Sequence, residues 1–304
     1  MTGIYKTKIH AWTLQLIGAG LLWAALGVAY ADTAEVNSAA SLRAKYAALL
    51  DQLSNNPFRK PVYLDSRQSS GDLNGEVYAR IDYPFAAVKG ALTESTPWCD
   101  ILILHLNVKY CRVVAGKSGS VLKTYLGTKH DEPLAAAQRI DLALRVAENT
   151  IDYLRVLLSA DTGPYSTRNY RIALEAVPLN GGHTFIHLSY SYAYGLMAKL
   201  AIQTYLATFG GNKVGFTVID KQPDGRPIHV GGVRGILERN AMRYYLAIDA
   251  YLGAASSPAA QQFEKRLRDW YALTERYPRQ LHELEQGEYL SMKRKEFERQ
   301  QTEP

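Results

Sequence analysis

Hydrophobic and polar positions alternate strictly through the middle of the chain. Within residues 139–148, Ile140, Leu142 and Leu144 are separated by Asp141 and other non-core side chains. A period of two predicts a half-buried strand, because successive side chains of a strand point to opposite faces of its sheet. Further strands are predicted over residues 75–83, 107–115, 120–127, 153–160, 168–177 and 183–195.

A period of three to four residues predicts helices outside this region. The clearest are residues 38–53 and a long helix over 232–252 whose apolar stripe includes Leu237, Ala241 and Tyr244. Shorter or more charged helices are predicted over 85–92, 94–105, 196–208, 261–276 and 280–300. We expect a polar loop over 65–74 and a small hairpin within 214–230.

The first 31 residues have the pattern of a secretory signal peptide. Lys6 and Lys8 precede an apolar run over 14–28, and Ala-Tyr-Ala at 29–31 precedes Asp32. A basic start, an apolar segment and an A-x-A site are the three parts of such a signal. We therefore expect cleavage between Ala31 and Asp32.

Cleavage would place the mature protein in the periplasm or outside the cell. The competing interpretation is an uncleaved membrane anchor, because residues 11–31 approach the roughly 20 residues that span a bilayer. Removing residues 1–31 lowers the net charge from +6 to 33 − 29 = +4, since the segment holds two lysines and no acid before Asp32. This small excess is spread along the chain and argues against nucleic-acid binding.

Composition narrows the class further. A hydrophobic content of 47% excludes a disordered chain, and two cysteines exclude a Cys₄ metal site. Cys99 and Cys111 are expected to form a disulfide in an oxidising compartment, the alternative being two buried free thiols. The 21 tyrosines against 7 phenylalanines are unusual and suit a wet cavity, although composition alone does not establish one.

The order of elements is one strand, two short helices, six strands and a closing helical region. Its most specific parts are VYARIDYPFAAVKGAL at 77–92, the passage from helix to strand after Trp98, and EAVPLNGGHTFIHLSYSY at 175–192. This order resembles the helix-grip fold of the START-like (SRPBCC) superfamily. The resemblance implies an α+β fold, in which a seven-stranded antiparallel curved sheet surrounds a long C-terminal helix, with extra helices at both ends. It also implies a ligand cavity.

The resemblance divides the chain into four parts. They are a signal peptide (1–31), an N-terminal helix and loop (32–74), a START-like ligand-binding domain (75–253) and charged C-terminal helices (254–304). The cavity residues are expected on two strands and the long helix: Tyr170, Ile172, Leu174, Ala176, Ile186, Leu188, Tyr190, Tyr192, Tyr194, Tyr244 and Ile248. Alternatively, the tyrosines fill an ordinary core and send their hydroxyls to its rim.

Few residues indicate chemistry. Arg234, Glu238, Arg239 and Arg243 line one helix, and Arg234 and Arg239 are candidate contacts for an anionic head group, the alternative being a solvated, partly paired face. His183 and His187 lie in a predicted strand, where four residues separate them by roughly 13 Å, too far to share a metal ion. We therefore expect no metal and no cofactor.

These observations favour an exported binding or carrier protein for a lipid or another hydrophobic small molecule. One alternative is an enzyme of the cyclase or hydrolase type on the same fold, which would need a polar pair inside the cavity. Asp82, Asp141 and Glu175 are predicted on outward faces, which disfavours it. A third hypothesis is an envelope protein whose charged helices over 261–300 contact a membrane surface or other envelope proteins.

Overall fold

The computed structural model describes residues 37–69, 71–116, 119–195 and 213–302, except for the side chain of Tyr165. These residues belong to one compact unit, Asn37–Pro304. The expected signal peptide and the predicted helix over 196–208 lie outside the described residues. In the part that is described, no helix is long and apolar enough to cross a membrane.

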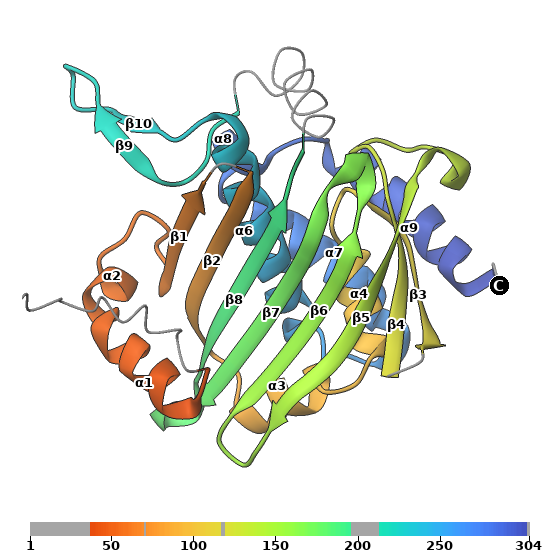
Figure 1. Cartoon of the computed structure of the whole chain (residues 1–304), viewed down its shortest axis with the longest axis horizontal. Helices are drawn as coiled ribbons and strands as arrows, with labels where there is room; N and C mark the ends of the chain where they lie inside the picture. Colours follow the sequence, from red (N-terminus) through yellow and green to blue (C-terminus); the bar gives the residue numbers. More distant parts are fainter. Residues whose placement is uncertain (1–36, 70, 117–118, 196–212, 303–304) are drawn as a thin grey trace, which may run out of the picture. The chain divides into compact units, whose positions relative to one another are not determined.

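The unit is built on one antiparallel sheet of eight strands in the order β1-β2-β8-β7-β6-β5-β4-β3 (Figure 1). The strands are β1 (Val62–Gln68), β2 (Asp72–Ile81), β3 (Val108–Gly116), β4 (Gly119–Leu126), β5 (Gln138–Asn149), β6 (Leu154–Thr162), β7 (Arg168–Pro178) and β8 (Thr184–Ala193). The alternation predicted for β5 is confirmed, since Ile140, Leu142 and Leu144 are buried while Arg139 and Asp141 are exposed.

The sheet has one strand more than predicted. The segment 65–74, expected to be a polar loop, instead holds most of β1 and the start of β2, which pair from Val62 opposite Ala79 to Gln68 opposite Leu73. β1 is an edge strand, and such strands tolerate polar side chains on the face turned to water. Because of this polar composition, the sequence predicted a loop where the structure has a strand.

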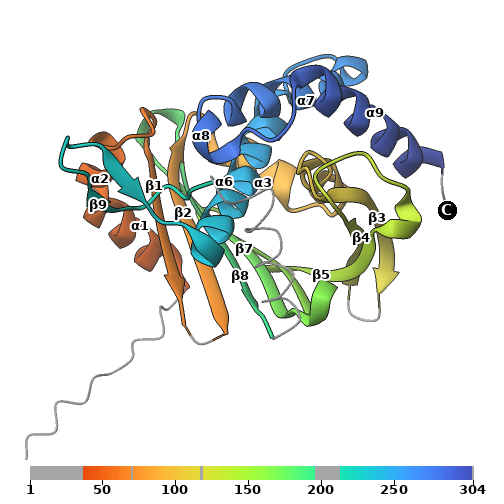
Figure 2. The same cartoon turned by 90° about the horizontal axis from the view of Figure 1, so that it is seen from above.

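The long predicted helix is α6 (Gly232–Gly253), and it packs against β1, β2 and β8. Figure 2 shows the sheet bending around the side that carries this helix. Helix and sheet approach closely at Gly75, where a Cβ atom would lie 3.1 Å from the side chain of Leu237. The α+β helix-grip arrangement expected from the order of elements is confirmed.

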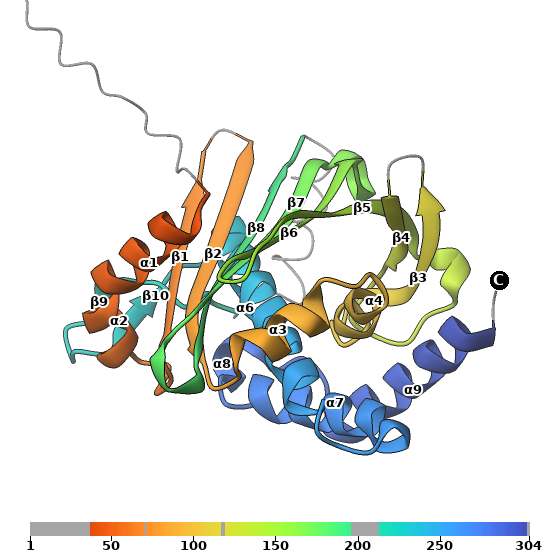
Figure 3. The same ribbon diagram turned by 90° about the horizontal axis from the view of Figure 1, so that it is seen from below.

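Two short helices cover one end of the concave face: α3 (Phe85–Leu92), which packs against β7, and α4 (Thr96–Leu102), which packs against β3 (Figure 3). Cys99 in α4 and Cys111 in β3 form the predicted disulfide, with Cα atoms 5.2 Å apart. The disulfide therefore ties this helical cover to the outermost strand of the sheet.

Helices at both ends complete the unit. The predicted helix over 38–53 is confirmed as α1 (Ala39–Ala48) and α2 (Leu50–Ser54), which pack on the convex face. The charged C-terminal helices are α7 (Ala259–Thr274), α8 (Pro278–Leu281) and α9 (Gln286–Thr302). A separate hairpin, β9 (Val218–Lys221) and β10 (Pro227–His229), precedes α6.

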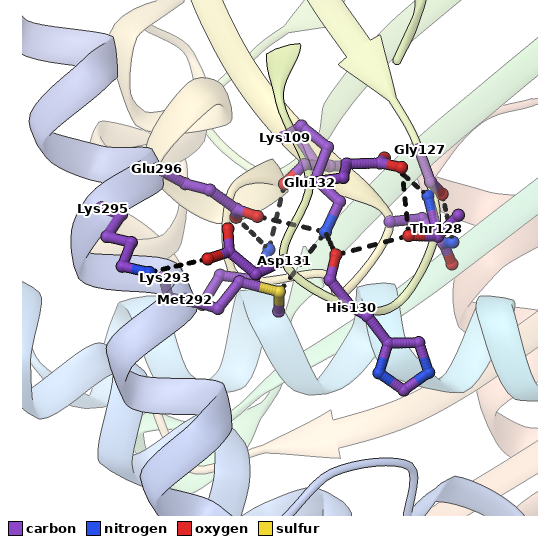
Figure 4. A network of polar contacts seen from close by, with 12 residues as sticks. Lys109, Gly127, Thr128, His130, Asp131, Glu132, Met292, Lys293, Lys295 and Glu296 are labelled. Carbon is purple, nitrogen blue, oxygen red and sulfur yellow. Dashed lines mark hydrogen bonds and ion pairs between the residues drawn. The ribbon is translucent and has the colours of Figure 1, made fainter. Parts of the chain in front are cut away.

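A closed network of polar contacts holds α9 against β3 (Figure 4). Lys109 of β3 donates to Glu296 Oε1 at 3.1 Å, to the His130 carbonyl and to a methionine sulfur of α9. Lys293 donates to Glu296 Oε2 at 2.7 Å and to the carbonyls of His105 and Val108. Each ammonium thus has three acceptors for its three donors.

Candidate functional site

The predicted cavity residues lie on the concave face in successive cross-strand rows. From one end to the other, Ile172 pairs with Tyr190, Leu174 with Leu188, and Ala176 with Ile186. The last row is fully buried beside α3, where the Thr184 hydroxyl also bonds to the Tyr83 carbonyl. Ala176 and Ile186 therefore belong to a covered core end, away from the tyrosines.

Four tyrosines gather at the opposite end of this face. The rings of Tyr170 and Tyr192 stack with centroids 5.1 Å apart, and Tyr190 lies 5.5 Å from Tyr192. Tyr244 of α6 meets Tyr190 edge-on at 5.2 Å. The structure thus brings together residues from β7, β8 and α6 that the sequence placed on separate elements. We call these four residues the tyrosine cluster.

The hydroxyls of this cluster are neutral and mostly unpaired within the described chain. Tyr170 shares a hydrogen bond with Thr167 at 3.2 Å, but none joins Tyr190, Tyr192 or Tyr244 to another described residue. Burial raises the pKa of all three phenols above its usual value of 10.0. Each therefore presents an O–H group able to donate to a polar atom nearby.

Two predicted residues lie at the margins of this cluster. Tyr194 is half-buried after the end of β8, and its hydroxyl accepts a hydrogen bond of 3.2 Å from Gln68, as the rim alternative described. Ile248 is buried in the C-terminal half of α6, one turn beyond Tyr244. The tyrosine cluster is therefore smaller than the predicted set.

A histidine that sequence reasoning missed joins the cluster to a group of charges. His105 is buried, and its ring stacks on Tyr244 at 4.7 Å. Burial and the nearby charges of Arg243, Lys293 and Lys129 lower the pKa of His105 well below 6.5, so the ring is neutral. Its position after an apolar run gave no signal of this role.

The charged group contains Lys129, Arg239, Arg243 and Glu283, which we call the cation cluster. Lys129 donates to Glu283 Oε1 at 2.6 Å, and Arg243 donates to the same oxygen at 2.8 Å. Arg239 is buried and donates to the Val214 carbonyl at 3.4 Å. Burial and the neighbouring arginines lower the pKa of Lys129 to about 7.

The two arginines proposed as anion contacts lie in different surroundings. Arg239 is in the cation cluster, whereas Arg234 donates to the Ser66 hydroxyl at 2.7 Å and lies 3.8 Å from Glu238. Glu238 is buried and accepts backbone hydrogen bonds from Phe216 and Thr217. The alternative of a solvated helix face is wrong for Glu238, Arg239 and Arg243, because each is at most 1% exposed.

The convex face carries a separate polar network. Glu175 accepts hydrogen bonds from Tyr153 and pairs with His187 at 2.9 Å, while His183 pairs with Asp82 at 2.9 Å. The two histidines thus contact different carboxylates, and no group of metal ligands occurs in the described ranges. Asp82 is exposed and Glu175 lies on the outer face, as predicted.

A polar hollow of about 540 Å³ lies where the start of β1 and the end of β2 meet α6 and α7. Its charged lining residues are Lys60, Arg80, Asp82, Asp249, Lys265, Asp269 and Arg276. Four cations thus face three carboxylates, and Lys265 pairs with Asp269 at 2.6 Å. This nearly balanced surface hollow is distinct from the tyrosine cluster.

No protein-family model and no curated protein matches the chain. Among solved structures, it is similar to a START superfamily protein from Mycobacterium smegmatis, with 14% identity over 45% of this chain and 92% of that chain and a TM-score of 0.30. Human StAR-related lipid transfer protein 5 has 10% identity over 56% and 89%, with a TM-score of 0.31. A Streptomyces aromatase/cyclase has 11% identity over 68% and 95%, also with a TM-score of 0.31.

At identities of 10–14% and TM-scores of 0.30–0.31, these likenesses carry no conclusion about the chain's family or ligand. The α+β arrangement is seen in the chain's own sheet and in α6. What the chain binds has to be argued from its own residues.

Proposed function

We propose that the protein binds a hydrophobic small molecule against the concave face, at the tyrosine cluster. The observation that carries this proposal is the gathering of Tyr190, Tyr192 and Tyr244 with neutral hydroxyls that lack partners in the described chain. Phenol hydroxyls at an apolar surface take their hydrogen bonds from water or from a ligand. A ligand with an apolar body and a polar atom would satisfy both the rings and the hydroxyls.

The neighbouring rows of the face fit the apolar body of such a ligand. Ile172, Leu174 and Leu188 are buried beside the tyrosines, and Ala160 of β6 lies opposite Tyr170. Ala160 offers little side-chain volume at this end of the face. Apolar contact supplies affinity, and a few polar groups fix orientation, which is the usual composition of a small-molecule site.

Titration with N-phenylnaphthylamine, an uncharged apolar dye, tests this proposal. We expect fluorescence enhancement with the unmodified protein and its loss in Ala160→Trp, because the indole would lie directly opposite Tyr170 and cover the proposed contact surface. Ala143→Trp is the matched control, since Ala143 is exposed on the opposite face of the neighbouring strand β5. No binding by the unmodified protein, or equal binding by both variants with intact folds, would contradict the proposal.

We further propose that this binding occurs outside the cytoplasm, as a carrier function in the periplasm or after secretion. The signal pattern before Asp32 and the disulfide between Cys99 and Cys111 support this location. Protein recovered from the cell envelope should begin at Asp32 on N-terminal sequencing. A chain that still begins at Met1 would favour the anchored alternative. Contacts of α7 and α9 with a membrane or envelope partner stay a prediction.

A further inference from the structure

We propose a second binding site, in which Arg59, Lys60 and Arg80 hold the phosphate group of a small soluble ligand. The site goes beyond the proposed function, because it lies apart from the tyrosine cluster. It follows from three properties of the described residues: two adjoining hollows, cations without counter-charges, and a loop that fixes two of these cations in place.

The polar hollow of about 540 Å³ adjoins a second hollow of about 310 Å³ beside α1 and α2. Lys60, Pro61 and Arg80 line both hollows, which together form one groove that we call the cationic groove. Ser54 and Arg59 complete the polar lining of the smaller hollow together with the Tyr46 side chain, and no carboxylate of the described chain lines it. The N-terminal helices thus supply one wall of this groove.

Cations outnumber carboxylates along the cationic groove. Four cations that line it form no ion pair in the described chain: Arg59, Lys60, Arg80 and Arg276. Lys265 pairs with Asp269 at 2.6 Å, which leaves Asp82 and Asp249 as the other carboxylates of the larger hollow. Burial raises the pKa of Asp249, and the charges of Lys60 and Arg276 oppose this rise. The excess of positive charge is therefore concentrated at the smaller hollow.

Arg80 lies between the two hollows, near the end of β2. Its backbone N–H donates to the Pro61 carbonyl at 3.0 Å, which holds this part of the strand beside the loop that carries Arg59 and Lys60. The Arg80 side chain is half-buried, and its Nε atom is buried without a hydrogen-bond partner in the described chain. A phosphate oxygen is an acceptor that matches the fork of donors on a guanidinium group.

The loop before β1 is anchored to the rest of the chain. The buried ring of Phe58 packs on Phe216 and Tyr277, with centroids 5.5 and 5.9 Å apart, and the Tyr277 hydroxyl donates to the Phe58 carbonyl at 3.2 Å. Arg59 follows with a φ of 55°, a left-handed conformation that is uncommon outside glycine. Residues held in such conformations are concentrated at ligand sites. The anchored loop therefore fixes the backbone of Arg59 and Lys60 at the groove.

A phosphate monoester fits this arrangement better than a carboxylate does. It carries a charge of about −1.5 to −2 at pH 7 and three acceptor oxygens, whereas a carboxylate offers one charge and two oxygens. Three cations, from the loop and from β2, can each meet one phosphate oxygen. The larger hollow continues from this point to Asp249, whose carboxylate can accept hydrogen bonds from hydroxyl groups of the ligand.

Calorimetric titration of the mature protein with glycerol 3-phosphate tests the inference. At pH 7 and about 20 mM salt, where exposed charges are little screened, we expect saturable binding at one site. Acetate should bind at least about tenfold more weakly, because it has fewer charges and acceptors. Equal affinities for the two anions would overturn the assignment of a phosphate, and the absence of saturable binding would overturn the site.

Substitutions locate the binding in the cationic groove. Arg80→Gln should weaken binding of glycerol 3-phosphate about tenfold, the effect of losing one charge-assisted hydrogen bond. Arg59→Gln should weaken it several-fold, and because Arg59 is exposed, this variant provides the test if Arg80→Gln does not fold. Arg145→Gln is the matched control, since Arg145 is exposed on β5 and lines neither hollow.

Unchanged affinity in Arg80→Gln and Arg59→Gln would contradict the inference. Equal weakening in Arg145→Gln would also contradict it, because net charge alone would then explain the effect. Binding of N-phenylnaphthylamine should be the same in all three variants, because the tyrosine cluster lies elsewhere. A parallel loss of dye binding would show that the two sites are one and would overturn the second site.

Discussion

Two glutamates in this molecule each bridge two cations, yet their surroundings differ, since the side chain of Glu296 is 1% exposed and that of Glu283 is 11% exposed. Glu296 joins Lys109 and Lys293, and backbone carbonyls and a methionine sulfur accept the remaining protons of both lysines. Glu283 joins Lys129 and Arg243, where Arg239 adds a further buried charge and Arg243 Nε keeps no acceptor in the described chain. Both clusters contain ion pairs, so ion pairing does not distinguish them. They differ in whether every donor has an acceptor in the described chain.

The difference indicates separate roles. The first cluster is closed and fixes α9 to β3, so its value lies in stability. The second is partly exposed and lies next to the tyrosine cluster, because His105 stacks on Tyr244, so it borders the proposed binding site. Two kinds of experiment test this difference between the clusters: substitution of a glutamate and titration of the lysines.

The largest effect is expected from Glu296→Gln. This change leaves two fully buried lysines without their shared counter-charge, and breaking such a buried pair typically costs about 3–5 kcal/mol. Urea unfolding of the mature protein measures it. Asp131→Asn, which breaks the exposed pair with Lys295, should change the free energy of unfolding by less than about 1 kcal/mol. Equal effects of the two variants would refute the structural role of Glu296.

Replacing both cysteines by alanine should lower stability next most. The disulfide between Cys99 and Cys111 closes a loop with a separation of 12 residues, which in the chain-entropy treatment corresponds to about 3 kcal/mol. Alkylation of the native protein should label neither thiol until it is reduced. Because the bridge holds α4 rather than the tyrosine cluster, binding of N-phenylnaphthylamine should survive in the folded double variant. Loss of that binding would connect two regions that the structure separates.

The smallest effect concerns the pH dependence of stability through Lys129. Its pKa is about 7 in the folded protein against the ordinary 10.5, under burial and the charges of Arg243 and Arg239, opposed by Glu283. Between about pH 7 and 10.5 the folded state therefore binds fewer protons than the unfolded chain. The free energy of unfolding rises with pH in this window.

Lys129→Met should flatten this rise by up to about 1.4 kcal/mol per pH unit. Lys129 also lowers the pKa of His105 and of Glu283, but burial and nearby charges hold the first well below 6.5 and the second is lowered from 4.5, so both groups titrate below this window. Lys293, whose pKa burial lowers to about 8, is common to both and cancels in the difference. Parallel stability curves for the variant and the unmodified protein would show that Lys129 does not have a lowered pKa.

The alternation of apolar and polar residues predicted most of the sheet, because each half-buried strand shows this pattern within its own sequence. β5 shows this directly, and the period of α6 predicted its packing face in the same way. β1 was missed because an edge strand exposes polar groups, and its buried Ser66 is explained by Glu238, a residue far along the chain. A partner so distant in the sequence cannot be predicted from the residues around Ser66.

The site was predictable in part for the same reason. Tyr170, Tyr190 and Tyr192 share a face by strand periodicity, so their gathering could be anticipated. His105, Lys129 and Glu283 come from three loops with no periodicity, and only the fold brings them beside Arg243. Their proximity is a property of the folded chain and leaves no motif in the sequence.

Native mass spectrometry of the gently purified mature protein tests the central claim most directly. The account predicts a mass above that of the chain from Asp32 to Pro304, which collapses on activation with release of a hydrophobic molecule. A bare chain that also fails to take up N-phenylnaphthylamine would contradict the account.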